Sequence, residues 1–329
     1  MQESARLVPI LEAHLRDCPD DLTALDELEG ICAGLGMGSS YARECHLRHL
    51  ARSLGHEGVD AALAALRSAL DSPGHDAILH IHLAQILALQ DRPCEAGEEL
   101  LLGTKWRAIE SPRFLLHLIP GSTADHEREE IAAALEAGLA ELEELFDLRW
   151  ERSRPIVYFL YESSLHKKLA TGDPMPAHAH SRQAEVHAVH GRYLRVGALH
   201  ESCHILLGSL GDPPMLMQEG AAEYAALREQ AHSTYLRARS RGGELHLGRL
   251  LDDPRFTEAD PWLSYPMAGS FAGFLIRDRG VASFKDLYGS SKGDPRGAVR
   301  RVYGCSVDSL EARWRRFLAA AEADGSAGA

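Results

Sequence analysis

The chain has 329 residues, of which 45% are hydrophobic, and a formal net charge of −13. A chain of this length and composition can bury a substantial core, and two folded units are the natural expectation. The negative charge argues against nucleic acid or an anionic membrane surface as the main partner, because phosphate binding needs a concentrated basic patch.

Neither a secretion signal nor a membrane anchor is predicted from the order of charged and apolar residues. No charged-then-apolar leader follows Met1, and no apolar run reaches the roughly 20 residues that cross a bilayer. The six cysteines are dispersed without paired CxxC spacing, which is typical of reduced thiols and unlike a disulfide framework. We therefore expect a cytoplasmic protein with no membrane-spanning segment.

Residues 1–108 are expected to form an all-α domain. From residue 5 to about 107, apolar residues recur three and four apart in runs of 12 to 18 residues, separated by turn signals such as Pro73. Their order resembles tetratricopeptide repeats, in which stacked helix pairs present a concave surface. An irregular helical bundle is the alternative. The resemblance implies that a protein partner or substrate binds this domain.

Near residue 110 the pattern changes to a mixture of strands and helices. We expect strands at 111–119 and 154–161, with a long amphipathic helix at 126–148 between them. A loop rich in Gly, Pro and His at 171–183 follows, and then a further short strand at 184–191.

The last part of the chain is helical in pattern from residue 194 onward. The predicted fold class is therefore α+β: a helical repeat-like domain, followed at 109–320 by a small mixed sheet with a mostly helical C-terminal half. Residues 321–329 are expected to be a disordered tail.

The segment LHESCHILLGSL at 199–210 contains the pattern His-Glu-x-x-His. Residues four apart on an α-helix share a face and lie about 6 Å apart along the axis, so His200 and His204 can bind one ion beside Glu201. The flanking residues are uncharged and lack proline, which favours a buried, unbroken helix over a chance string. A zinc site needs a third protein ligand, and Glu219, 15 residues after His204, is the downstream candidate.

The pattern HESCH followed by DPPMLMQEGAAEY at 212–224 resembles the gluzincin branch of zinc peptidases, in particular the peptidase-MA-like domains. In that family HExxH is followed by Glu-Gly-x-Ala-x-Tyr, and the glutamate before the glycine is the third zinc ligand. The resemblance implies this role for Glu219 and a role for Tyr265 as the donor that stabilises an oxyanion. It covers about residues 111–318, with one departure at Met217, where many relatives have tryptophan.

These residue types predict hydrolysis of an amide bond. Zn2+ held by two histidines and a carboxylate brings the pKa of a bound water toward about 7. Glu201 can then accept the proton as general base and deliver it to the leaving amine. Glu223, one turn after Glu219, is placed to hold a ligand histidine through its second N–H, although an ordinary exposed helix carboxylate is the alternative.

Other residues near the motif compete for a functional role. His178 and His180 would share one face of a strand, whereas His187 and His190, three apart, would face opposite sides. We prefer to interpret 184–191 as an edge strand that pairs with an extended peptide. The 171–183 segment is interpreted as a surface loop, with a lid as the alternative. Cys203 is expected to be a small buried residue of the motif helix.

The sequence thus predicts a zinc-dependent metallopeptidase of gluzincin type that acts on a peptide or protein substrate. A zinc amide hydrolase that acts on a small molecule or biosynthetic intermediate is one alternative, and a narrow closed pocket would favour it. A catalytically inactive helical scaffold is the other. The presence of His200, Glu201, His204 and Glu219 together argues against a scaffold.

Overall fold

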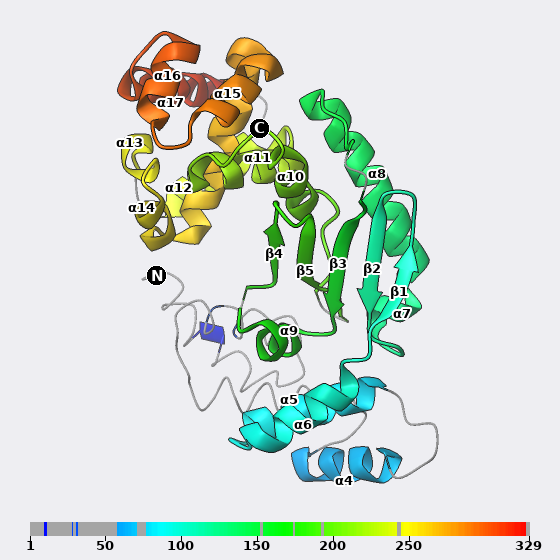
Figure 1. Ribbon diagram of the computed structural model, residues 1–329. Helices are drawn as coiled ribbons and strands as arrows, with labels where there is room; N and C mark the ends of the chain where they lie inside the picture. The colour runs from blue at the N-terminus through cyan, green and yellow to red at the C-terminus, as the bar shows by residue number, and fades with distance from the viewer. Residues whose placement is uncertain are drawn as a thin grey trace. The chain divides into compact units, whose positions relative to one another are not determined.

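The computed structural model describes residues 58–70, 77–151, 154–173, 175–191, 194–241 and 245–326, together with Ile10, Leu11, Leu28 and Ile31. Within these residues the protein is a mixed α and β structure, mostly helical, with a five-stranded sheet (Figure 1). The expected α+β class is confirmed at this level.

Of the helices that precede the sheet, the described residues give the bounds of α4 (Val59–Leu70), α5 (Ala77–Leu89) and α6 (Pro93–Gly103). Helix α5 is apolar on nearly every side and is buried along most of its length, which accounts for the strong hydrophobic pattern of this segment. Pro93 occupies the first turn of α6, where the missing N–H has no intrahelical partner to lose. Pro73 and most of residues 1–57 lie outside the described residues, so the repeat-like domain stays a prediction.

The sheet has the strand order β1-β2-β3-β5-β4, and β1 pairs antiparallel with β2. Strand β2 alternates strictly, with Phe114, Leu116 and Leu118 buried on one face and the residues between them on a half-exposed face. The predicted strands at 111–119, 154–161 and 184–191 are confirmed, whereas β1 was not predicted. The strands are β1 (Arg107–Glu110), β2 (Phe114–Leu118), β3 (Ile156–Tyr161), β4 (Ala177–His180) and β5 (Glu185–Val189).

The segment at 171–183 is not wholly a loop, because it contains strand β4. The alternation Ala-His-Ala-His has the period of a strand, but the Gly and Pro residues just before it hide that signal in the sequence. Strand β5 lies between β3 and β4, so the interpretation of 184–191 as an edge strand is wrong. The edge on this side of the sheet is β4.

The chain divides into two compact units. Unit 1 comprises Met1–Ala132, Val157–His178 and His187–Val196, and unit 2 comprises Ala133–Ile156, Ala179–Val186 and Gly197–Ala329. The segments of the two units alternate along the chain.

Unit 2 has a large apolar core built around Trp314, which is fully buried. Its indole ring stacks on Tyr235 with ring centroids 5.1 Å apart, and its Nε1–H donates a hydrogen bond to the hydroxyl of Ser270. The helices that follow β5 are α10 (His200–Leu207), α11 (Met215–Leu227), α12 (Gln230–Arg241), α13 (Leu247–Leu250), α14 (Asp253–Glu258), α15 (Pro261–Ser290), α16 (Pro295–Tyr303) and α17 (Val307–Ser326).

Helices α7 (Thr123–His126) and α8 (Arg128–Phe146) lie between β2 and β3 in the chain, and α9 (Ser164–Thr171) lies between β3 and β4. Helix α8 corresponds to the long helix predicted at 126–148. Helix α17 continues to Ser326, into the segment expected to be a tail, and 327–329 lie outside the described residues. None of the helices in the described part of the chain combines the length and apolar character that a membrane span requires.

Candidate metal centre

Helix α10 carries the His-Glu-x-x-His pattern and begins at His200. Its inner face is apolar: Cys203 is 1% exposed within the core of unit 2, and burial raises the pKa of its thiol. This agrees with its interpretation as a small buried residue. The helix is followed by its C-cap residue Gly208, where an added Cβ would lie 2.4 Å from the Cβ of Ser181. The close approach lets the Ser181 hydroxyl donate a hydrogen bond to the carbonyl oxygen of His204, at 2.9 Å.

Helix α11 supplies the third candidate ligand. It starts after Pro214, and Glu219 lies on the side that faces the two histidines of α10. One carboxylate oxygen of Glu219, Oε2, is 3.3 Å from Nε2 of His200 and 3.5 Å from Nε2 of His204. The structure therefore brings Glu219 to the two histidines, although Glu219 follows the nearer one, His204, by 15 residues in the sequence.

The spacing of these three groups fits a tetrahedral metal ion. Bonds of about 2.0–2.2 Å from zinc to nitrogen and oxygen place neighbouring ligand atoms about 3.4 Å apart. The two measured distances from Glu219 lie on either side of that value, and one ligand atom from each residue falls within 4.8 Å of the others. Two imidazoles and a carboxylate are also the donor types that zinc accepts.

Glu223 lies behind one of the two histidines. Its Oε1 is 3.4 Å from Nδ1 of His200, so the two ring nitrogens of His200 face two different carboxylates. A histidine that binds metal through one nitrogen is commonly oriented by a carboxylate at the other. The predicted position of Glu223, one turn after Glu219, produces this arrangement.

The site is built to stabilise positive charge. Burial alone would lower the pKa of His200, but its contacts with Glu219 and Glu223, and the charge of Glu201, raise it to about 10. Burial alone would raise the pKa of Glu219, but its contacts with the two histidines lower it to about 2. Several carboxylates that gather around half-buried imidazoles favour a bound cation.

Glu201 and Tyr265 complete the set of predicted site residues. Glu201 is 9% exposed and follows His200 on α10. Tyr265 lies on α15, and burial raises the pKa of its hydroxyl, as do the charges of Glu219, Glu223 and Glu201. The Tyr265 hydroxyl therefore stays protonated and keeps an O–H that can donate a hydrogen bond.

Two glycines that the sequence analysis did not single out bring α15 against α11. An added Cβ on Gly220 would lie 2.7 Å from the carbonyl oxygen of Ala268, and one on Gly269 would lie 2.7 Å from the Cβ of Glu223. The helices can cross this closely only because neither position carries a side chain. The glycine that follows Glu219 in the motif indicates such a close contact, because glycine is unfavourable inside a helix unless packing requires it.

The other histidines near the motif fall into two environments. His190 pairs through Nε2 with Glu127, at 2.8 Å, and its side chain is 6% exposed. His178, His180 and His187 gather on the hairpin of β4 and β5, where one ligand nitrogen from each lies within 4.8 Å of the others. The sequence places His178 and His180 on one face of a strand but does not show that His187 meets them across the paired strands.

No protein-family model, curated protein or solved structure matches this chain. The assignment of a function therefore depends on the geometry of the site and on the motif that supplies its residues.

Proposed function

We propose that the protein is a zinc-dependent metallopeptidase of gluzincin type. The observation that carries the proposal is the convergence of His200, His204 and Glu219 at ligand-to-ligand distances of 3.3 and 3.5 Å, with Glu201 on the same helix as the histidines. A zinc ion held by these three residues supplies Lewis acidity and brings the pKa of a water toward about 7.

Glu201 is proposed to act as the general base. Its carboxylate takes a proton from the attacking water and delivers it to the leaving nitrogen, so that the amine departs in neutral form. Proton transfer by a positioned side chain of this kind contributes about 10²–10⁴-fold to the rate. The position of Glu201 supports this role, because it directly follows His200 on α10 and is 9% exposed, so its carboxylate is largely shielded from bulk water.

Glu223 and Tyr265 are proposed to support the reaction. Glu223 accepts the Nδ1–H of His200 and so holds the ring with Nε2 toward Glu219. Tyr265 keeps its proton and can donate it in a hydrogen bond to the oxyanion that forms when water adds to the amide carbonyl.

The edge strand supports a peptide as substrate. Strand β4 ends at His180, and the next residue, Ser181, donates a hydrogen bond to the carbonyl oxygen of His204 on the motif helix. An extended peptide that pairs with β4 by backbone hydrogen bonds would therefore run toward the metal centre. This assigns to β4 the role that the sequence analysis gave to 184–191.

The test is hydrolysis of a quenched fluorescent peptide library by the zinc-loaded full chain. We expect cleavage by the wild type and a fall in kcat of at least about 100-fold in Glu201→Gln, with the zinc content unchanged. Glu229→Gln is the matched control, because Glu229 is an exposed carboxylate just beyond the end of α11. Full activity in Glu201→Gln would refute the mechanism.

The same assay, repeated with short acyl amides in place of the peptides, separates the two alternatives. A small-molecule amidase would leave all peptides intact and cleave the acyl amides, with the same dependence on Glu201. An inactive scaffold would cleave neither class in the wild type. Either result would replace the proposed function.

A further inference from the structure

A row of stacked rings crosses the half-exposed face of the sheet. His117 on β2 stacks on Phe159 of β3, Phe159 on His187 of β5, and His187 on His178 of β4, with centroid distances of 4.7, 4.9 and 4.9 Å. Each of these residues occupies an alternate, half-buried position of its strand. At the edge of this face the row ends in three histidines that come from a single hairpin.

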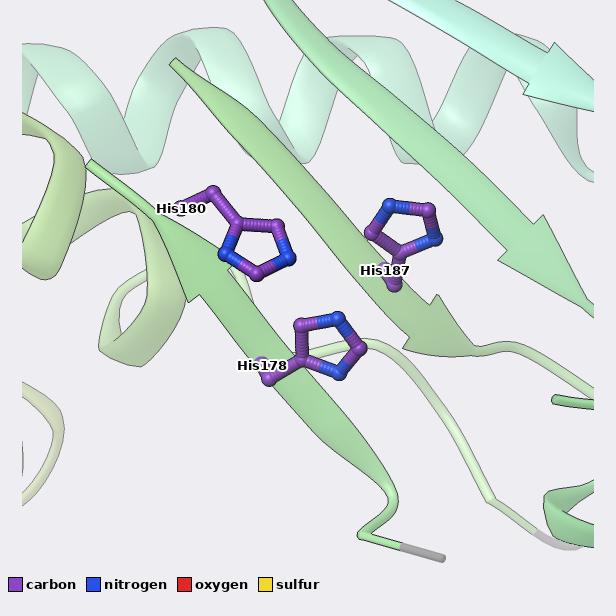
Figure 2. Close-up of side chains that lie close together, drawn as sticks. All are labelled: His178, His180 and His187. Atoms are coloured by element: carbon purple, nitrogen blue, oxygen red, sulfur yellow. The ribbon is translucent and has the colours of Figure 1, made fainter. Parts of the chain in front are cut away.

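We propose that His178, His180 and His187 form a second metal site that binds a divalent transition-metal ion such as zinc, distinct from the His200 centre. Two of the residues are separated by one position on β4, so they share a face, and the third comes from the paired strand β5 (Figure 2). Figure 2 shows the three rings on the same side of this hairpin.

Polar groups lie beside Nδ1 of two of the rings and favour Nε2 as the nitrogen that binds the metal. Nδ1 of His178 lies 2.5 Å from Oδ2 of Asp173, and this carboxylate is also 3.2 Å from Nζ of the fully buried Lys167. A carboxylate that pairs with a buried ammonium stays ionised, and its negative charge beside Nδ1 favours the tautomer of His178 that carries its proton on Nδ1. This tautomer has its lone pair on Nε2, as a metal ligand requires.

His187 is oriented in a similar way. Its Nδ1 is 2.7 Å from the hydroxyl oxygen of Tyr161, a side chain that is 3% exposed and therefore fixed in position. The phenol oxygen can accept the Nδ1–H, and in that tautomer the lone pair for a metal is on Nε2. Two of the three ligands thus have a polar group beside Nδ1, a carboxylate for His178 and a phenol for His187, an arrangement common in metal sites.

His180 completes the set as the third ligand. It is the last residue of β4 and is exposed. One nitrogen from each of the three rings lies within 4.8 Å of the others, and tetrahedral binding at about 2.0–2.1 Å from each nitrogen brings them to about 3.4 Å. Small rotations of the side chains supply that change. Three neutral imidazoles with a fourth, solvent-facing position suit zinc, nickel or copper and do not suit calcium or magnesium.

A metal at this position would link β4 to β5. Strand β4 has four residues and one strand neighbour, so its pairing with β5 is short. An ion that binds the folded hairpin and not the unfolded chain stabilises it by mass action. The site would therefore hold the edge strand in place.

The test uses the full-length chain carrying His204→Ala, which removes a ligand of the His200 centre, and measures zinc binding by equilibrium dialysis with elemental analysis. We expect about one zinc per chain to remain. Adding His180→Ala should weaken this binding by at least about 100-fold, since even loss of a partner behind a ligand costs about 10–100-fold. Adding His246→Ala instead should have no effect, because this exposed histidine belongs to neither group.

Two results would overturn the second site: no zinc bound by the His204→Ala chain, or equal binding with and without His180. Should His204→Ala fail to fold by circular dichroism, Glu219→Gln takes its place. In the otherwise native chain, nitrogen NMR of the imidazoles should show the Nε2 signals of His178 and His187 shifting on zinc addition, and unchanged signals would contradict the site. The two proposals are tested by different variants. Loss of zinc on changing Glu219, with His180 intact, reports on the His200 centre, whereas loss of zinc on changing His180 reports on the second site.

Discussion

The glycine after the proposed ligand Glu219 should be required by packing and not by backbone conformation. An alanine at position 220 would place its Cβ 2.7 Å from the carbonyl oxygen of Ala268, where ordinary contact begins at 3.4 Å. Helices α11 and α15 would therefore have to separate by roughly 0.7 Å, a displacement that overpacked cores resist. Overpacking of this kind costs about 1–3 kcal/mol.

Alanine also stabilises a helix more than glycine does, and this gain in stability must be subtracted from the cost of overpacking. In a helix interior the gain is about 1 kcal/mol. The net effect of Gly220→Ala is then a loss of stability of about 0–2 kcal/mol. Gly97→Ala is the matched control, since Gly97 is an exposed position within α6 and an added Cβ meets nothing within 4 Å. It should gain about 1 kcal/mol.

The assay is native-state hydrogen exchange, which reports the opening free energy of each helix separately. Exchange should accelerate in α11 of Gly220→Ala and slow in α6 of Gly97→Ala. Because the same displacement moves α15, which carries Tyr265, zinc-dependent turnover should also fall in Gly220→Ala. Equal gains in stability at the two positions would refute the idea that a close helix crossing builds the site.

Three other predictions follow from the contacts of single side chains. Tyr265→Phe should lower kcat by about 10²–10³-fold with zinc content unchanged, if Tyr265 donates to the oxyanion; steady-state kinetics checks this, and an unchanged kcat would exclude it. Glu223→Gln should weaken zinc binding by about 10–100-fold in competition with a chelator, and unaltered affinity would make Glu223 an ordinary helix carboxylate. Burial, and to a smaller extent the charge of His82, lowers the pKa of His166 from 6.5 to about 3. Between these two values the unfolded chain binds a proton at this histidine and the folded chain does not. The contribution of His166 to stability is therefore complete above pH 6.5 and is lost as the pH falls toward 3. Denaturation of His166→Gln should accordingly show a weaker loss of stability over that range than the wild type, and parallel curves would contradict the assignment.

Local patterns predicted the elements that carry the site. Alternating apolar residues identified β2, β3 and β5, and the apolar flanks of the His-Glu-x-x-His pattern identified α10 as a buried helix. The ligand candidates could be named because their spacing on a helix is a local property. The contact between His200 and Glu219 could be predicted only from the family motif, because local sequence patterns do not determine how α10 and α11 pack.

Features that depend on neighbours in space could not be predicted. Strand β1 has only four residues and a mostly exposed pattern, so it forms because β2 offers a partner. The position of β5 inside the sheet depends on β4, whose short run was hidden beside Gly and Pro residues. The group formed by His178, His180 and His187 likewise appears only when β4 and β5 are paired, since register between strands sets which side chains meet.

The zinc content of the full chain tests the central claim most directly. Elemental analysis of the wild type should give about two zinc ions per chain, one at the His200 centre and one at the histidine hairpin. Glu219→Ala should lose one of them, and His180→Ala should lose the other. A Glu219→Ala chain that retains all the zinc of the wild type would contradict the account, because no ion would then depend on the carboxylate that lies 3.3 Å from His200 and 3.5 Å from His204.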